Sequence, residues 1–452
     1  MLFYFVQRGE TLFAIARRYR TTVYALVTAN RLRDPDALTP GQALLIPQPG
    51  ERPIPPPGIV HRVRKGETVM QLAARFGTTV PAILLANQLA HPEFLMPGQK
   101  LLIPEPPGPV TDWPVLGRTP ARSANTPPAF CGEPRLRWSY RAGVSGGAGP
   151  SAPVIRYGRV YVGLGDGIYR ALDQETGALV WRTPFRGSTD MPGPAAPATP
   201  AVYDGLIYLC GPGGGVSALE ASSGRPVWQA AADEGLAGAP LAAEGVIYCG
   251  TAAGGVLALE AKTGARVWRQ PLDGPVTQPV ALGDGRLFAA TEAGSLWALD
   301  ALSGEVLWRQ DLNRPYPPVF GELVVVAGGQ AFDPLTGDLL WVRPDPGGSP
   351  AIAGESVCYP GLWVDLFTGE ALCPGGQPSE EVPAAGAGGH LVAGGLHVWA
   401  TPDRELVGWD VREHRRRWSV PLPAAAAGMA LAGGTLILSL ADNSVLAFAA
   451  GG

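Results

Sequence analysis

The stretch ALDQETGALVW, Ala171 to Trp181, decides the fold because the chain repeats it. Each copy runs from an apolar pair through an acidic residue and a turn to a closing Trp. The other copies are ALEASSGRPVW from Ala218, ALEAKTGARVW from Ala258, ALDALSGEVLW from Ala298 and AFDPLTGDLLW from Ala331. A catalytic motif does not need five copies, so the phrase indicates a structural unit that cannot stand alone.

The closing Trp recurs beyond these five phrases. Trp138 and Trp418 extend the series, and VDLFTGEALC, with Cys373 in the place of Trp, lies in its longest gap. The closing positions of these eight repeats are residues 138, 181, 228, 268, 308, 341, 373 and 418. Periods near 40 residues with many short strands are typical of β-propeller blades. The sequence therefore predicts eight blades, or seven if the short region around Cys373 fails to form a full sheet.

One period, Ala239 to Trp268, illustrates the four predicted strands. Apolar residues alternate in APLAAE, GVIYCGTA, GGVLALE and ARVW, which is a strand pattern. Gly254-Gly255 suits a tight hairpin and Thr263-Gly264 the next turn, because Gly adopts positive φ readily. The Trp ring is large, and we expect it to fill the seam between neighbouring sheets.

The two ends of this region complement each other. After Trp418 only 34 residues remain, which is enough for three strands. PRLRWSY at Pro134 has the pattern of the fourth strand of a blade, but the first three strands of a blade do not precede it. An open ring would leave two unpaired sheet edges. We therefore expect the strand around Trp138 to pair with the strand at Leu446 to Phe448.

A second internal repeat lies at the N-terminus. Tyr4–Pro47 aligns without a gap on His61–Pro104 at an offset of 57. Each copy is predicted to fold as strand, helix, helix, strand. In the first copy Phe5 and Val6 open a strand and Leu44–Ile46 closes the unit. The first helix follows a Thr11 cap and has one apolar face, at Leu12, Ile15, Ala16 and Tyr19.

This unit resembles the LysM domain over its whole length, in V-x-x-G-E-T-L, I-A, T-T-V, A-N and P-G-Q-x-L-x-I-P. It departs from the family at Glu10 and Glu67, where Asp is usual. The resemblance implies that a shallow groove between two loops binds N-acetylglucosamine in peptidoglycan or chitin; backbone groups can bond the acetamide and an apolar floor can take its methyl. The implied binding residues are Gly9, Glu10, Thr11, Leu12, Asn30, Leu38, Pro40 and Gly41, and Gly66, Glu67, Thr68, Val69, Asn87, Leu95, Pro97 and Gly98.

Pro-rich linkers separate the predicted units. We place LysM domains at 3–48 and 60–105, linkers at 49–59 and 106–111, and the propeller at 112–452. Such linkers are semi-extended and would let two weak sugar sites reach along one glycan strand. The expected fold class is therefore multidomain, with two small α+β modules followed by an all-β propeller.

The propeller phrases resemble the PQQ-like repeat, A-x-D-x-x-T-G-x-x-x-W, from about Asp112 to Gly452, and WPVLGRTPARSAN at Trp113 resembles the lead-in of such propellers. The family includes quinoprotein alcohol dehydrogenases, which need pyrroloquinoline quinone, Ca²⁺, a catalytic Asp and often adjacent cysteines. This sequence has no adjacent cysteines, so we expect no cofactor, no metal and no catalytic residue. Asp173, Asp300 and Asp333 recur with the turn and are interpreted as turn residues.

Fold alone does not fix function. The non-catalytic relatives include a propeller lipoprotein of the outer-membrane β-barrel assembly machinery, which is a protein scaffold. The hypothesis for this chain is accordingly a glycan-anchored scaffold with a protein partner on the propeller loops. The alternatives are a wall-tethered quinoprotein oxidoreductase and an intracellular interaction protein with degenerate LysM modules.

Other candidate sites are weaker. GLGDG at Gly163 precedes no helix and is not a dinucleotide loop. REHRRRW at Arg412 predicts a solvated hairpin, with a partner contact as the alternative. The histidines show no ligand spacing (His61, His91, His390, His397 and His414). The cysteines suit small apolar strand positions (Cys131, Cys210, Cys249, Cys358 and Cys373), and a Cys358–Cys373 disulfide stays open.

Composition limits the partners. Charged residues make up 16% of the 452 residues and the net charge is −4, which favours neither a nucleic-acid surface nor a polybasic membrane anchor. No apolar run is long enough to span a bilayer. MLFYFVQRGETLF turns polar at Gln7, so we expect no ordinary signal peptide. The LysM resemblance predicts the cell envelope or a spore surface, with the cytoplasm as the alternative.

Overall fold

The computed structural model divides into two compact units, Met1–Val110 and Thr111–Gly452. Each unit is described by itself. The structure describes residues 2–6, 15, 26, 43–46, 58–63, 100–104, 125–126, 132–143, 149–184, 198–211, 215–231, 235–321, 324–343, 349–353, 356–359, 362–372, 389–393, 396–410 and 415–450.

Two antiparallel strand pairs in the N-terminal unit share one register. β1 (Leu2–Phe5) pairs with β2 (Ala43–Ile46), and β3 (Gly58–Arg62) pairs with β4 (Lys100–Pro104). Leu2 faces Ile46 in the first pair, and Ile59 faces Ile103 in the second. Both partners are displaced by the same 57 residues, so the duplication extends to the backbone pairing.

Buried positions of this unit also recur at the same offset. Val6 and Val63 follow the first strand of their copies and are each 3% exposed, while Leu44 and Leu101 are buried in the second strands. Ile15 and Leu26 are helical and fully buried. These residues follow the expected order of strand, helix, helix, strand, although the first strand ends at Phe5, one residue before Val6.

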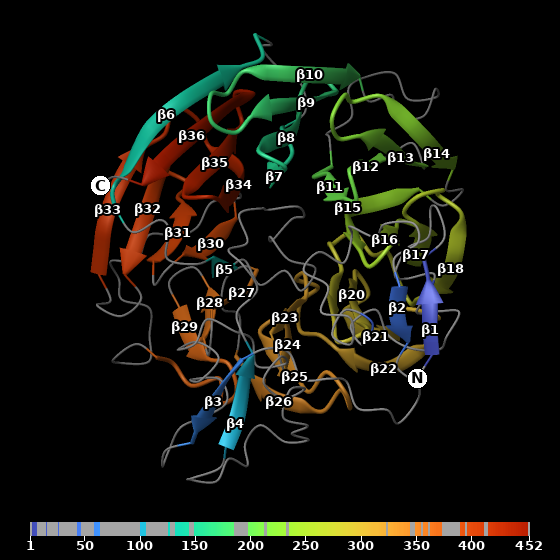
Figure 1. Ribbon diagram of the computed structural model, residues 1–452. Helices are drawn as coiled ribbons and strands as arrows, with labels where there is room; N and C mark the ends of the chain where they lie inside the picture. Colours follow the sequence, from blue (N-terminus) through green and yellow to red (C-terminus); the bar gives the residue numbers. More distant parts are fainter. Residues whose placement is uncertain are drawn as a thin grey trace. The chain divides into compact units, whose positions relative to one another are not determined.

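The second unit is a ring of eight antiparallel sheets, here blades 1 to 8 (Figure 1). The first five blades have four strands each. Their strands are β7 (Val154–Arg156), β8 (Arg159–Leu164), β9 (Ile168–Asp173) and β10 (Leu179–Pro184) in blade 1; β11 (Ala201–Tyr203), β12 (Leu206–Gly211), β13 (Gly215–Glu220) and β14 (Pro226–Ala231) in blade 2; β15 (Leu236–Ala243), β16 (Val246–Thr251), β17 (Gly255–Glu260) and β18 (Arg266–Pro271) in blade 3; β19 (Ala281–Gly283), β20 (Arg286–Thr291), β21 (Ser295–Asp300) and β22 (Val306–Asp311) in blade 4; and β23 (Val319–Gly321), β24 (Val324–Ala327), β25 (Gln330–Phe332) and β26 (Leu339–Val342) in blade 5.

Blades 6 to 8 complete the ring with more variation. Their strands are β27 (Ala351–Ala353), β28 (Ser356–Tyr359) and β29 (Leu362–Asp365) in blade 6; β30 (His390–Ala393), β31 (Leu396–Ala400), β32 (Glu405–Asp410) and β33 (Arg415–Pro421) in blade 7; and β34 (Ala426–Ala432), β35 (Thr435–Leu440), β36 (Ser444–Ala450) and β6 (Pro134–Arg141) in blade 8. A two-residue strand, β5 (Asn125–Thr126), adds to the inner edge of blade 7 in parallel with β30.

Blade 6 is the short sheet anticipated around Cys373. Its described part has three strands, and a single bridge joins Val364 to Ala371 at the position where the first five blades have their fourth strand. Cys373 itself, and with it the Cys358–Cys373 question, lies outside the described residues. The eight-bladed prediction is confirmed and the seven-bladed alternative is wrong, because this region still forms its own sheet.

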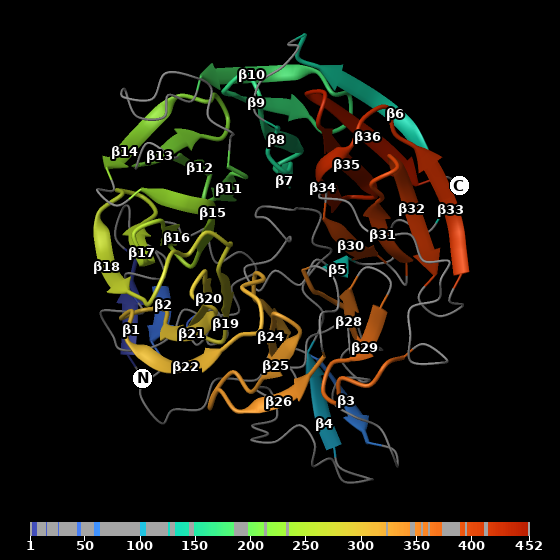
Figure 2. The same ribbon diagram turned by 180° about the vertical axis from the view of Figure 1, so that it is seen from behind.

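The ring closes between the two ends of the propeller sequence. β36 pairs with β6, with Ala447 opposite Trp138 and Phe448 opposite Leu136 (Figure 2). The last three strands of the chain therefore receive their fourth from a segment about 300 residues earlier, as expected. Pairing removes the two free edges that an open ring would expose.

The burial pattern explains why a ring forms. In blade 3 every residue of the inner strand β16 is buried, whereas in the outer strand β18 Trp268 is the one buried residue. Inner strands are covered on both faces because each sheet packs between two others. A single four-stranded sheet would leave both of these apolar faces in water.

Candidate functional site

The sugar-binding residues implied by the LysM resemblance lie outside the described residues. They are Gly9, Glu10, Thr11, Leu12, Asn30, Leu38, Pro40 and Gly41 in the first copy, and Gly66, Glu67, Thr68, Val69, Asn87, Leu95, Pro97 and Gly98 in the second. The described strands bracket them in the sequence, since Gly9 follows buried Val6 by three residues and β2 begins two residues after Gly41. Their contact with sugar stays a prediction.

The closing tryptophans join each blade to the next. Among the described residues, six of their indole N–H groups donate to a backbone carbonyl of the following blade. The bonds are Trp138 to Gln174 (2.9 Å), Trp181 to Ala221 (2.9 Å), Trp228 to Ala261 (3.0 Å), Trp268 to Ala301 (3.0 Å), Trp308 to Pro334 (3.0 Å) and Trp341 to Leu366 (2.9 Å). The expectation that Trp fills the seams is confirmed.

Each of these rings lies on the glycine of the next turn. Gly264 has φ +73°, and a Cβ placed on it would lie 2.6 Å from Trp228 Cε3. Any other residue would therefore suffer backbone strain and a collision with the ring. The repeated T-G and W of the sequence are the two halves of one contact between neighbouring blades.

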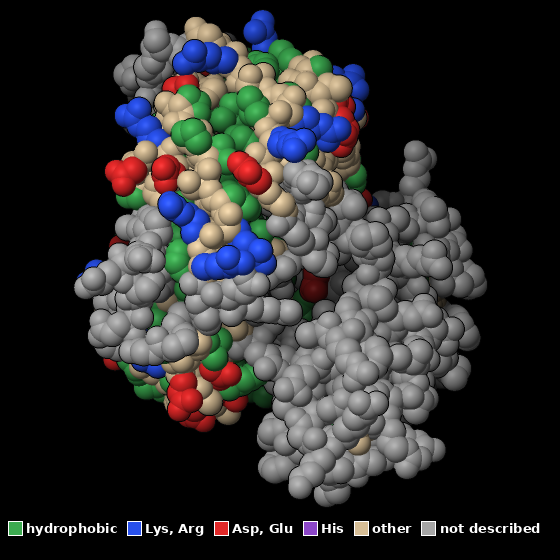
Figure 3. All heavy atoms as spheres, turned by 90° about the vertical axis from the view of Figure 1, so that its left-hand side faces the viewer, with side chains coloured by type: hydrophobic (Ala, Val, Ile, Leu, Met, Phe, Trp, Pro, Cys, Tyr) green, Lys and Arg blue, Asp and Glu red, His purple; other side chains and the backbone are tan. Residues whose placement is uncertain are grey.

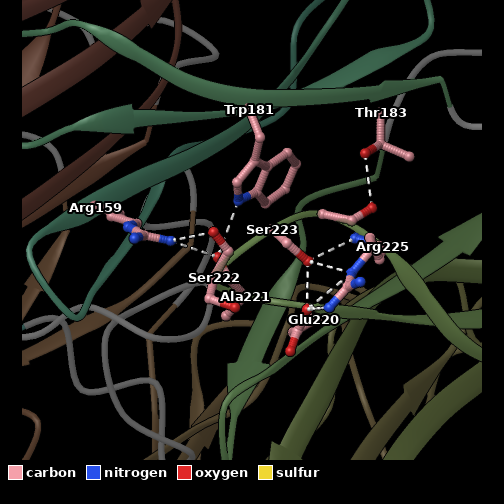
Figure 4. A network of polar contacts seen from close by, with 9 residues as sticks. Arg159, Trp181, Thr183, Glu220, Ala221, Ser222, Ser223 and Arg225 are labelled. Atoms are coloured by element: carbon pink, nitrogen blue, oxygen red, sulfur yellow. Dashed lines mark hydrogen bonds and ion pairs between the residues drawn. The ribbon is translucent and has the colours of Figure 1, made fainter.

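The seam between blades 1 and 2 shows the supporting polar contacts (Figure 4). Arg159 donates to the carbonyls of Ala221 and Ser222 at 3.0 and 2.8 Å, beside the indole of Trp181. Thr183 donates to the carbonyl of Gly224 at 2.8 Å. These bonds supply donors to the carbonyls of Ser222 and Gly224, and they add a second donor to the carbonyl of Ala221, which already accepts from Trp181.

The aspartates of the phrases are turn residues. One carboxylate oxygen of Asp300 accepts from the backbone N–H groups of Leu302 and Ser303 at 3.0 and 2.8 Å. Asp173 does the same in blade 1, and its hydrogen bonds with Thr176 hold the pKa of that carboxyl below its ordinary value. Such local bonds shape the turn that carries the glycine.

Two histidines meet in blade 7, a contact that the search for metal-ligand spacing in the sequence did not predict. His390 Nδ1 and His397 Nε2 are 2.6 Å apart, and His390 Nε2 is 2.7 Å from the carbonyl of Ser349. His397 is fully buried. The hairpin HLVAGGLHV is the sequence feature from which this contact could have been predicted. The pairing of Val392 with His397 places both histidines on one face of the sheet.

The hydrogen bonds determine the protonation of this pair. A carbonyl only accepts, so His390 Nε2 carries the hydrogen and His390 Nδ1 is an acceptor. His397 must then donate from Nε2, which leaves His397 Nδ1 as a bare acceptor, and this atom is buried without a hydrogen-bond partner. Burial lowers the pKa of His390 to about 4. Burial and the neighbouring His390 hold the pKa of His397 far below its ordinary value.

Tryptophans surround His397 at the seam between blades 6 and 7. Trp363 meets its ring edge-on with centroids 5.6 Å apart, and Trp399 lies at 4.9 Å. Trp409 stacks on Trp363 at 6.1 Å. The preceding blade has Cys373 in place of the closing Trp, and His414 replaces the turn glycine of blade 7. The aromatic cluster therefore fills the seam where the Trp–Gly contact is missing from the sequence.

Two described carboxylates, Asp166 and Asp273, are occupied by protein donors. Asp166, in the GLGDG hairpin, holds the buried guanidinium of Arg170 through two hydrogen bonds; although burial opposes it, Arg170 keeps the pKa of Asp166 below its ordinary value. Asp273 accepts from Thr291 at 2.8 Å and from Ser295 at 2.5 Å. Within the described residues, no three His, Cys, Asp or Glu side chains cluster as metal ligands.

The outer strands of blades 7 and 8 carry arginines beside carboxylates. Arg415, Arg416 and Arg417 are exposed on β33, as the solvated-hairpin interpretation expects, while residues 411–414 lie outside the described part. Arg417 pairs with Asp410 at 3.0 Å, and Arg141 on β6 pairs with Asp442 at 3.1 Å. Figure 3 shows basic, acidic and apolar side chains interspersed on this side of the propeller.

No helix in the described part of the chain is long and apolar enough to cross a membrane.

Comparison with known families matches both units. The profile of the family described as "Outer membrane protein assembly factor BamB" (PQQ_2) matches residues 133–235, 166–274 and 252–373, which together span more than half of the chain. The LysM domain profile matches residues 4–47 and 61–104.

Two relatives each align with about a fifth of the chain. The probable autolysin SsaALP of Staphylococcus aureus is 34% identical over 105 residues, covering 22% of this chain and 39% of that protein. The chitin elicitor-binding protein of Oryza sativa is 33% identical over 110 residues, covering 23% and 31%. The chain thus spans about a third of the length of these two relatives.

Among solved structures, a quinohemoprotein alcohol dehydrogenase, ADHIIG of Pseudomonas putida, superposes with a TM-score of 0.58 at 16% identity, covering 76% of this chain and 80% of that one. Identity this low carries the fold and not the activity.

Proposed function

Because the chain belongs to the β-propeller family described as outer membrane protein assembly factor BamB and carries two LysM domains, we propose that it is a non-catalytic scaffold anchored to glycan. The LysM domains bind an N-acetylglucosamine polymer, most directly peptidoglycan. The propeller presents its loops to a protein partner. The cell envelope or a spore surface is the place where such a polymer is available.

The duplicated LysM unit carries this proposal. Both copies have the same strand register at an offset of 57 residues, so one chain carries two binding units with the same strand pairing. One aligned relative is named for chitin elicitor binding and another is a probable autolysin. Two linked sites of modest affinity would hold one polymer far more tightly than either alone.

The repeated residues of the propeller support a structural role for that unit. The acidic residue, the glycine and the Trp of each phrase are used in turns and seams, as at Asp300, Gly264 and Trp228. The most prominent motif of the sequence therefore provides no catalytic group. The competing hypothesis of a quinoprotein oxidoreductase rests on the shared propeller fold.

Sedimentation with purified insoluble peptidoglycan tests the proposal on the full chain. We expect Asn30→Ala and Asn87→Ala each to lower the bound fraction by more than half, and the double variant to abolish binding, because avidity needs both sites. Asn313→Ala, the same change at an exposed propeller position, is the matched control and should bind normally. Equal binding by residues 111–452 alone would contradict the division of roles.

The oxidoreductase hypothesis has a separate test. The full chain is supplied with pyrroloquinoline quinone, Ca²⁺ and a dye acceptor, and dye reduction is followed with simple alcohols and sugars. We expect no turnover above the protein-free control. Substrate-dependent dye reduction would establish the enzyme and refute the scaffold proposal.

A further inference from the structure

Two cysteines from neighbouring blades face each other across a seam. Cys210 lies on β12 of blade 2 and Cys249 lies on β16 of blade 3, 39 residues further along the chain. Their sulfur atoms are 3.4 Å apart. Both side chains are buried, with 2% and 1% exposure, and both are reduced thiols.

The sheet geometry explains why these side chains meet. Tyr208 donates from its hydroxyl to the carbonyl of Ala261 in blade 3 at 3.2 Å, so its side chain points toward that blade. Cys210 lies two residues further along the same strand and therefore on the same face. Trp228 donates to the same carbonyl at 3.0 Å. The two hydrogen bonds hold blades 2 and 3 at a fixed separation beside the thiols.

Equivalent positions in the adjoining seams lack this pair. Alignment of the inner strands on Tyr161, Tyr208 and Tyr248 places Gly163 and Leu209 at the seam between blades 1 and 2. The next seam, with Phe288 as the aligned residue of blade 4, has Gly250 and Ala289 at these positions. The opposed thiols are therefore a property of one seam and not a by-product of the repeat.

We propose that Cys210 and Cys249 are a modification site that forms an inter-blade disulfide, with a low-molecular-weight disulfide as the oxidant. One thiolate attacks the small disulfide, which gives a mixed disulfide and releases one small thiol. The second thiolate then displaces the second small thiol and forms the protein sulfur–sulfur bond. Two electrons pass from the protein sulfurs to the small disulfide, and the two protons end on the released thiols.

The closed seam protects the pair, and an open seam exposes it. The hydrogen bond with Cys249, together with burial, holds the pKa of the Cys210 thiol far above its ordinary value, and thiols in this state react slowly. Oxidation therefore takes place while the blades assemble or transiently separate. Once formed, the bond links two sheets and restricts the unfolded chain, which raises the unfolding temperature.

The experiment uses the full chain, reduced and unfolded, then refolded in buffers of reduced and oxidised glutathione at graded ratios. Thiols are alkylated under denaturing conditions and the digest is analysed by mass spectrometry. We expect loss of two thiols per chain, a peptide joining Cys210 to Cys249, and unfolding a few degrees higher than in the reduced protein. Dithiothreitol should reverse all three changes.

Three variants separate this site from the other cysteines. Cys210→Ala and Cys249→Ala should each abolish the linked peptide and the temperature shift, whereas Cys358→Ala should keep both. Retention of both thiols at every glutathione ratio, in protein that has refolded, would overturn the proposal. So would a linked peptide that joins either cysteine to a different one.

Discussion

Two seams of the propeller are closed by different means. Between blades 1 and 2, Trp181 lies on the turn glycine Gly224 and donates to Ala221. Between blades 6 and 7 the sequence has Cys373 where the Trp would stand and His414 where the glycine would stand. A cluster of histidine and tryptophan rings around His397 occupies that seam instead.

In the seam between blades 6 and 7 the Trp and the glycine are both replaced. A Trp ring needs a residue without Cβ opposite it, since an added Cβ would approach to 2.6 Å. Once the ring is absent, the glycine has no remaining packing role and another residue can take its place. The replacement seam is built from titratable and aromatic side chains, so the two kinds of seam should respond differently to mutation and to pH.

The largest expected effect is loss of a seam Trp. Trp308→Ala removes a buried ring and leaves the carbonyl of Pro334 without its donor, and we expect a loss of about 3–5 kcal/mol in unfolding free energy. Urea unfolding followed by circular dichroism measures it. Trp297→Ala is the control. Trp297 lies on β21, is less buried than Trp308, and donates its indole N–H to the exposed carboxylate of Asp273. Equal losses for the two variants would contradict the special role of the seam.

A smaller effect isolates the contact between the glycine and the ring. Gly264→Ala and Gly205→Ala impose nearly the same backbone strain, at φ +73° and +74°, but a Cβ meets Trp228 only at Gly264. The strain costs about 1–2 kcal/mol in each, and we expect Gly264→Ala to lose at least about 1 kcal/mol more because of the collision. Thermal unfolding of the two variants gives the difference. Equal unfolding temperatures for the two variants would show that the Trp228 ring moves aside without a loss of stability.

The stability contributed by the seam between blades 6 and 7, which contains His390 and His397, should fall in acid. His390 has its pKa lowered to about 4 by burial, against an ordinary value of 6.5. Stability from the neutral pair is complete above pH 6.5 and is lost as pH falls from 6.5 toward 4, because the unfolded chain takes up protons first. The slope is at most about 1.4 kcal/mol per pH unit for each histidine.

Unfolding in urea at pH 7.5, 6.5, 5.5 and 4.5 measures this slope. The double variant His390→Phe/His397→Phe is the control, since carboxylates also titrate at the acid end of the range. Its stability should vary less between pH 6.5 and 5.5 than that of the unchanged protein. Parallel pH profiles for the two proteins would rule out the histidine pair as the cause.

The smallest expected effect concerns the turn that carries the glycine. Asp300→Ala removes the carboxylate that caps two backbone N–H groups in blade 4, at a cost of about 1 kcal/mol because the turn is partly exposed to water. Asp300→Asn retains an acceptor oxygen and should recover most of the loss. Thermal unfolding compares the three proteins, and a neutral effect of the Ala change would show that the glycine alone sets the turn.

The sequence by itself determined the repeat architecture. The spacing of Trp and T-G predicted eight blades, and the count of strands predicted that β6 would close the ring onto β36. The 57-residue offset predicted two equivalent N-terminal units, which the strand pairing repeats. These features follow from period and apolar alternation, which local backbone geometry converts into strands and turns.

Only the tertiary structure decided which side chains meet across the seams. His397 could be placed beside His390 from the hairpin register, but its surrounding tryptophans come from two blades. Cys210 and Cys249 lie in separate sheets, and no periodicity in the sequence aligns one with the other. Contacts within a sheet are set by hydrogen-bond register, whereas contacts between sheets depend on how far apart and at what angle the blades pack.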